Sequence, residues 1–216
     1  MKNARRANRT HPPVALRPEN RPEEHPDKRF RRTEHILRET LLDMLEQKRL
    51  VDITTTELCR RADVSRNTFY AHYTAVEHLY DDMENDLVRS LVNAAGVTVP
   101  GPGRSREEVF EANVAAAQRF LEIVKENRRI AEALMRGHVL SDFYRKLYPL
   151  MREKILQMVE TAGQASGDAL PFGAKFLYMF HGSRAWIDRW TANGMVEDTR
   201  MIAEHLVRME MAVIEG

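Results

Sequence analysis

Five polar side chains that can hydrogen-bond to nucleic-acid bases or phosphates lie within seven residues of one another. They are Arg66, Asn67, Thr68, Tyr70 and His72. Arginine can bond guanine through two hydrogen bonds, asparagine can bond adenine in the same way, and Thr, Tyr and His can reach base edges or phosphates. A short helix that only Phe69 anchors to a core would leave this polar set outside. Such a set suits the major groove of DNA.

Residues 54–80 supply the elements that would hold these side chains in place. Thr54 can cap a first short helix, in which apolar residues recur every three or four positions: Leu58, Cys59 and Ala62. Asp63 and Val64 would form a tight turn, and Ser65 can cap the second helix. The segment is therefore predicted to be a helix-turn-helix whose second helix faces DNA.

This stretch resembles the N-terminal domain of the tetracycline-repressor (TetR) family of bacterial transcription regulators. The resemblance covers about the first third of the chain that we expect to be ordered. The matching residues are Ile36 and Leu37 in the first helix, Ile53-Thr54 at the start of the second, Ala62-Asp63-Val64-Ser65 at the turn, and Thr68-Phe69-Tyr70-Ala71-His72-Tyr73 in the third.

Three positions depart from the family pattern. Asp63 replaces the usual turn glycine, and aspartate visits the left-handed region more readily than most residues. Tyr73 replaces a phenylalanine. Val76 replaces the lysine that usually opens the fourth helix and contacts a phosphate, so one ionic contact is lost.

The resemblance implies DNA contacts from the helix caps, the third helix and the start of the first helix. Two members of this set have an alternative role, because Tyr70 could be a partly buried packing residue and His72 could cap or solvate a helix end. The full set is Thr33, Thr54, Thr55, Thr56, Ser65, Arg66, Asn67, Thr68, Tyr70, His72 and Tyr73.

Composition is consistent with a small intracellular regulator. The chain has 216 residues, of which 43% are hydrophobic, and its net charge is +1. The single cysteine, Cys59, excludes an intrachain disulfide and suits a reducing compartment. No run of about 18 apolar residues and no hydrophobic signal core occur. We therefore expect a soluble, cytoplasmic protein.

The N-terminal segment, residues 1–30, is predicted to be a disordered basic arm. It contains five prolines and almost no aliphatic periodicity, and residues 1–32 carry ten basic and four acidic side chains. The arm could follow phosphates or enter the minor groove, which would add salt-sensitive affinity that does not depend on sequence. Alternatively, it is a solvated extension or results from the choice of start codon.

The remainder of the chain reads as helices, without a strand pattern. A first helix begins near Thr33, with Ile36, Leu37, Leu41, Leu42 and Leu45 on its buried side. Thr74 and Glu77 resemble a capping box for a fourth helix, and Pro149 is expected to kink or restart a seventh. The later helices are predicted to start near 105, 130, 141, 171 and 199, with a loop at 163–168.

The predicted fold is therefore all-α, with about nine helices. Residues 31–74 would form the helix-turn-helix DNA-binding domain, and residues 75–216 would form an effector-binding and dimerisation domain.

The resemblance also implies an effector pocket between the fourth and eighth helices. Many aromatic residues and methionines suit a moderately apolar small molecule. Asn113 and His181 are candidate polar anchors on otherwise apolar helices, where an unpaired group would be costly. The candidates are Phe110, Asn113, Phe120, His138, Phe143, Tyr144, Tyr148, Phe176, Met179 and His181, with Met135 and Met151.

The two last helices are expected to form a homodimer. In the TetR family the corresponding helices of two subunits make a four-helix bundle, and residues 186–194 resemble the end of the eighth helix in one subgroup. The expected interface consists of the apolar stripe Phe180, Ser183, Ile187, Trp190, Ile202, Leu206, Met209 and Val213. A two-fold dimer would require a roughly palindromic operator in double-stranded DNA.

Two other functional classes compete with this hypothesis. An enzyme is disfavoured, because the sequence contains no His-x-x-x-His or Cys/His metal spacing, no phosphate-binding glycine loop and no nucleophile elbow, so no catalytic residue, metal or cofactor is expected. The alternative favoured by Val76 is a helical regulator that acts mainly through protein contacts.

Overall fold

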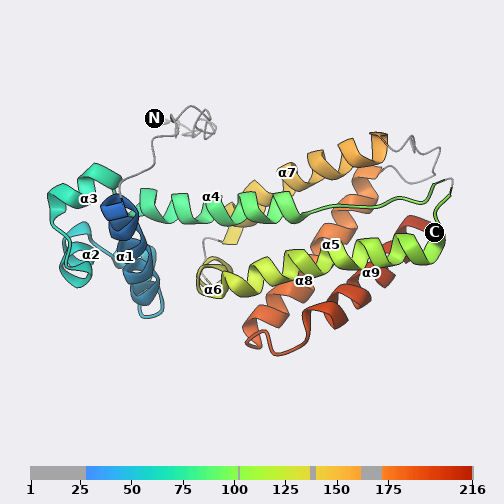
Figure 1. Ribbon diagram of the computed structural model, residues 1–216. Helices are drawn as coiled ribbons and strands as arrows, with labels where there is room; N and C mark the ends of the chain where they lie inside the picture. Colours follow the sequence, from blue (N-terminus) through green and yellow to red (C-terminus); the bar gives the residue numbers. More distant parts are fainter. Residues whose placement is uncertain (1–27, 102, 137–139, 162–171, 216) are drawn as a thin grey trace, which may run out of the picture.

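The computed structural model describes residues 28–101, 103–136, 140–161 and 172–215, and every regular element in those ranges is helical (Figure 1). Three short elements and one longer helix form the N-terminal part, which we call the head: α1 (Lys28–Leu45), a 3-10 turn (Leu50–Asp52), α2 (Thr55–Ala62) and α3 (Arg66–His72). The rest, which we call the body, consists of α4 (Val76–Ala94), α5 (Arg106–Glu126), α6 (Arg128–Arg136), α7 (Leu140–Thr161), α8 (Phe172–Ala192) and α9 (Thr199–Glu215). The predicted all-α fold is confirmed.

The head has a core of its own beneath the turn between α2 and α3. Leu37 and Leu41 of α1, Leu58 of α2 and Phe69 of α3 are completely buried. Phe69 is the one buried residue of α3, so the attachment of this helix depends on a single aromatic ring. Asp63 ends α2 in the left-handed conformation with φ 52°, and its N–H bonds the Cys59 carbonyl. The aspartate thus performs the role expected of glycine.

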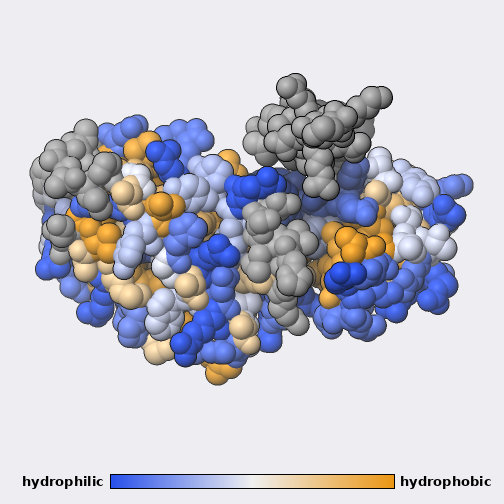
Figure 2. Space-filling view, turned by 180° about the vertical axis from the view of Figure 1, so that it is seen from behind, coloured by the Kyte–Doolittle hydropathy of each residue, from blue (hydrophilic) through white to orange (hydrophobic). Residues whose placement is uncertain are grey.

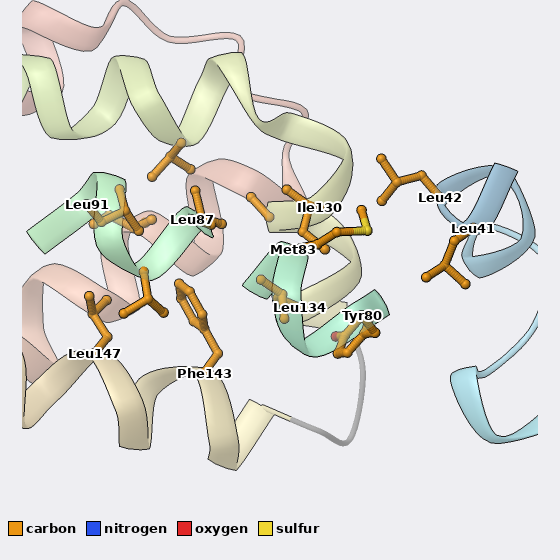
Figure 3. Packing of buried hydrophobic residues seen from close by; sticks show 14 of the residues in the cluster. Leu41, Leu42, Tyr80, Met83, Leu87, Leu91, Ile130, Leu134, Phe143 and Leu147 are labelled. Carbon is orange, nitrogen blue, oxygen red and sulfur yellow. The ribbon is translucent and has the colours of Figure 1, made fainter. Parts of the chain in front are cut away.

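Helix α4 runs from the head into the body (Figure 1), and its buried residues belong to the cores of both parts. Its buried residues recur at helical spacing, from Val76 and Leu79 through Met83 to Leu87 and Leu91. Figure 3 shows Leu41 and Leu42 of α1 facing Tyr80 and Met83, while Phe143 and Leu147 of α7 lie beside the later turns. One hydrophobic cluster therefore continues from head to body.

The other body helices pack around α4 and α5. α5 lies along α9 over most of its length, and α7 packs against α4. Ser105 and Glu108 form a complete capping box at the start of α5. Seen from behind, hydrophobic patches gather over the body among hydrophilic side chains (Figure 2).

Several expected boundaries need correction. Lys28, Arg29 and Phe30 belong to α1, which therefore begins before Thr33, and residues 1–27 and 163–168 lie outside the described residues. Ala75, rather than Thr74, is the N-cap of α4, because the Thr74 hydroxyl bonds the His78 ring instead. α7 continues through Pro149 as one helix.

Phe69→Ala tests whether one ring holds α3 in place. The substitution should lower the free energy of unfolding by about 3–5 kcal/mol, because it removes a buried aromatic side chain. Urea unfolding of both proteins measures this loss. The control is Asn67→Ala on the exposed side of α3, expected within about 0.5 kcal/mol of the parent. An equal loss of unfolding free energy in the two variants would show that the Phe69 ring does not hold α3 in place.

Candidate DNA-binding surface and effector cavity

Two capping side chains fix the helix-turn-helix. The Thr54 hydroxyl accepts a hydrogen bond of 3.2 Å from the Glu57 N–H at the start of α2, and the Ser65 hydroxyl accepts one of 3.1 Å from the Thr68 N–H at the start of α3. Each cap satisfies a backbone donor that the first helical turn leaves without a partner. Both predicted caps are confirmed, and α3 is held at a defined angle after α2.

The outer face of α3 is polar. Arg66, Asn67 and Thr68 are exposed, and Tyr70 is 48% exposed. The Arg66 guanidinium lies 6.0 Å from the centre of the Tyr70 ring, so the two side chains share one side of the helix. Because Phe69 alone faces inward, the helix presents a row of hydrogen-bonding groups to solvent.

His72 and Tyr73 are less available than the sequence suggested. The His72 ring stacks on Phe30 of α1 with ring centres 3.7 Å apart, and burial lowers its pKa, which favours the neutral form. The Tyr73 hydroxyl donates to Glu34 of α1 at 3.4 Å, and burial raises its pKa to about 12. Both side chains therefore join the end of α3 to α1, and their predicted contacts with DNA stay a prediction.

The predicted threonines occupy mixed positions. Thr54 and Thr56 are exposed at the start of α2, and Thr55 is half-buried. The half-buried Thr33 donates its hydroxyl to the Arg29 carbonyl at 3.0 Å within α1. Arg31 and Arg32, which follow Phe30 in α1, are exposed. Sequence reasoning placed these two residues in the basic run at 28–32 but not among the contact residues.

Two arginines connect the head to the body through ion pairs. Arg38 of α1 bonds Asp82 at 2.9 Å and Asp86 at 2.7 Å, both on α4. Arg129 of α6 reaches three carboxylates: Glu39 of α1 at 2.7 Å, Asp43 of α1, and Glu46 at 3.1 Å, the residue directly after α1. The position of α1 is thus coupled to both α4 and α6.

A cavity of about 180 Å³ lies inside the body, with walls from helices α4 to α9. Eight of the predicted effector residues line it: Asn113, Phe120, Met135, Phe143, Tyr144, Met151, Phe176 and Met179. Its surface is mostly apolar, and Met135 of α6 and Leu91 of α4 contribute to it. The effector pocket predicted between the fourth and eighth helices agrees in location with this cavity.

The remaining predicted effector residues do not line the cavity. The Phe110 ring lies beneath the Arg208 guanidinium, Tyr148 packs against Phe176 and Phe180, and His181 is exposed. His138 lies outside the described residues. His181 is therefore not an anchor within the cavity.

The polar groups around the cavity have specific partners. Asn113 holds the segment after α4, because its side chain accepts from the Thr98 N–H at 2.7 Å and donates to the Thr98 carbonyl at 2.9 Å. The side chain of the predicted anchor Asn113 is thus already hydrogen-bonded within the protein.

Three polar lining residues were not predicted as effector contacts: Ser183, Arg184 and Glu210. A polar residue at helical spacing normally indicates a solvent-facing position, so no pattern in the chain marks these three as lining residues.

The apolar stripe predicted as a dimer interface is largely internal. Ile187, Trp190, Ile202 and Leu206 are at most 9% exposed and belong to the core of the chain itself. Phe180 and Ser183 line the cavity, Val213 is half-buried, and only Met209 is exposed. The exposed apolar residues of α8 and α9 lie elsewhere: Leu177, Tyr178, Trp186, Met201, Met209 and Ile214.

Within the described ranges, no group of three or more His, Cys, Asp or Glu side chains could hold a metal ion. No helix there is both long and apolar enough to cross a membrane.

Comparisons with known proteins agree with this architecture. The family model for the TetR-type "transcriptional regulator C-terminal region" matches residues 115–211. No curated protein matches the chain at a significant level.

Three solved structures show the same fold. NalD, the secondary repressor of the MexAB-OprM multidrug efflux pump in Pseudomonas aeruginosa, matches with a TM-score of 0.61, 16% identity, and coverage of 85% of this chain and 95% of that one. The dihydroxyacetone kinase operon activator DhaS matches at 0.60, with 14% identity and coverage of 85% and 96%. A TetR-family regulator from Streptomyces coelicolor matches at 0.57, with 16% identity and coverage of 86% and 81%.

Arg66→Ala tests whether α3 reads bases. The loss of a two-bond contact to a base should cost about 1–3 kcal/mol on a duplex selected from random sequences, and much less on unrelated DNA. Titration of labelled duplexes, followed by fluorescence anisotropy, measures both. Arg119→Ala, an exposed change on α5 in the body, should affect neither. Equal weakening on the two duplexes would mean that Arg66 contacts a phosphate.

Proposed function

We propose that the chain is a TetR-family transcriptional regulator, and more narrowly a cytoplasmic, homodimeric repressor that a small-molecule effector releases from a palindromic operator. The observation that carries this proposal is the composition of α3. Phe69 is buried, whereas Arg66, Asn67, Thr68 and Tyr70 face outward. A helix with one buried aromatic side chain and a polar outer face can enter a major groove while it stays attached to its domain.

The proposed dimer uses the exposed face of α8 and α9. Met201, His205 and Met209 recur every four residues along α9, and all three are exposed. On α8 the exposed Tyr178 and Trp186 lie one turn on either side of Gly182, above which a side chain would meet open space. Such an apolar face with a small residue at its centre permits close contact with the same helices of a second copy.

Release by an effector requires a physical connection between cavity and head. Helix α6 supplies one, because Met135 lines the cavity and Arg129 binds the carboxylates of Glu39 and Asp43 on α1. Helix α4 supplies another connection. Its residue Leu91 lines the cavity, and the first turns of α4 pack on α1. A ligand could bind more tightly to the conformation in which the two heads are not spaced to fit the operator. Such a ligand would weaken operator binding, and the operator would weaken ligand binding by the same factor.

One observation favours a second candidate, a regulator that acts mainly through protein contacts. Val76 occupies the position of the family's phosphate-binding lysine and is only 2% exposed, so it packs in the core and contacts no phosphate. Protein contacts alone would give DNA binding with little dependence on salt or sequence, whereas an operator-binding repressor depends on both.

Selection of duplexes from a random pool tests the proposed function. The full-length protein should enrich an inverted repeat, because two α3 helices related by a two-fold axis read the same bases in opposite directions. Sedimentation of the complex should give two chains per duplex. A pool without enrichment after repeated rounds would contradict DNA reading, and enrichment of a single non-repeated half-site would contradict the dimer.

Arg129→Ala tests the connection between α6 and α1. The ion pairs are partly exposed, so the free energy of unfolding should change by no more than about 1 kcal/mol. Operator affinity should nevertheless fall by a factor of about 2–30, because α1 loses its fixed position on the body.

The matched control is Arg128→Ala. Arg128 precedes Arg129, but its ion pair is with Glu132 on its own helix, at 2.6 Å. This change should leave operator affinity unaltered. If the two variants bind operator alike, α6 does not position the head through Arg129.

A further inference from the structure

The cavity contains one acidic group, Glu210 of α9. Its carboxylate accepts a hydrogen bond of 2.7 Å from the Ser183 hydroxyl of α8, and both residues line the cavity. The carboxyl group is largely buried, although the residue as a whole keeps some exposed surface. Glu210 therefore presents an acid to whatever occupies this mostly apolar space.

Arg184 is the other charged residue of the cavity wall, and its charge is already balanced. The guanidinium lies 4.0 Å from the centre of the Tyr144 ring and bonds Asp188 at 3.3 Å. The Tyr144 hydroxyl also donates to Asp188. Arg184, Asp188 and Tyr144 thus form a closed group with no net charge.

Glu210 has no comparable partner among the described residues. The neutral Ser183 hydroxyl is its only hydrogen-bond partner there, and no ion pair reaches it. Burial raises the pKa of the Glu210 carboxyl, and the hydrogen bond from Ser183 offsets this rise only in part. A buried acid without a cationic partner is costly, so a cation in the cavity would be favoured there.

We propose that the effector is a small, mainly apolar molecule that carries one protonated amine, and that this amine forms an ion pair with Glu210. The inference rests on the proposed regulation by a small molecule and specifies its chemistry. An acidic effector is disfavoured, because Arg184 is already paired with Asp188 while Glu210 would repel a second anion.

The cavity volume limits the size of such a molecule. An apolar cavity of about 150 Å³ is known to hold benzene, and the cavity here measures about 180 Å³. One aromatic ring with a short aminoalkyl chain therefore fits. Phe143, Phe176 and Met179 would surround the ring, and the chain would direct the amine to Glu210 and Ser183.

Calorimetric titration of the full-length protein without DNA tests the proposal. The probes are phenethylamine, phenethyl alcohol and phenylacetate, which share a ring and a short chain but carry a positive, a neutral and a negative end. The amine should bind most tightly and phenylacetate most weakly. In Glu210→Gln, affinity for the amine should fall by about thirtyfold, since one partner of a buried charge pair is lost, while affinity for the alcohol stays the same.

Glu204→Gln is the matched control. It makes the same change on the same helix, but Glu204 lies outside the cavity and pairs with Arg200 at 3.1 Å. This variant should keep the preference for the amine. If Glu210→Gln fails to fold, the order of the three affinities on the unaltered protein still tests the proposal.

The proposal is overturned if the amine and the alcohol bind equally, if the amine does not bind at millimolar concentration, or if Glu210→Gln keeps the preference for the amine. Operator binding is measured separately by anisotropy. A protein that binds its operator but not the amine retains the proposed function and loses this inference. A protein that binds the amine through Glu210 but never enriches a DNA sequence loses the proposed function alone.

Discussion

The structure depends on the burial of one helix on two sides. The early turns of α4, with Val76, Leu79 and Tyr80, pack against the head, and its later turns, with Leu87 and Leu91, pack inside the body. The resulting core is continuous from Leu41 of α1 to Leu147 of α7 (Figure 3). Because a close-packed interior transmits displacement rather than absorbing it, the head cannot tilt without repacking the body.

This shared core connects the proposed effector cavity to the head. Leu91 is both a core residue of α4 and part of the cavity wall, and α6 extends from Met135 at the cavity to Arg129 on the carboxylates of α1. The ion pairs are partly exposed and add little to stability, but their geometry fixes where α1 lies. In the proposed mechanism, a ligand acts on two helices that the head already contacts, and no separate relay is needed.

The features predicted correctly from the sequence are those that local physics determines. The caps Thr54 and Ser65, the left-handed Asp63 and the buried Phe69 follow from residue type and spacing over a few positions. The dimer stripe could not be assigned, because α8 and α9 carry apolar residues on more than one side, and which side is buried depends on distant helices. Ile187 and Trp190 pack inward, while Tyr178 and Trp186 remain outside. Glu210 could not be recognised either, since only the tertiary fold encloses it.

The central claim is that the body holds the two heads at a fixed separation and orientation. The most direct test is affinity for the selected inverted repeat as its half-sites are moved apart by about 5 base pairs, which is half a helical turn. Without effector, this insertion should reduce binding to the level of unrelated DNA, and about 5 further base pairs should not restore full affinity, because the shared α4 core holds each head in one position on its body. Unchanged affinity across the series would show that the heads move independently of the body, and would contradict the account.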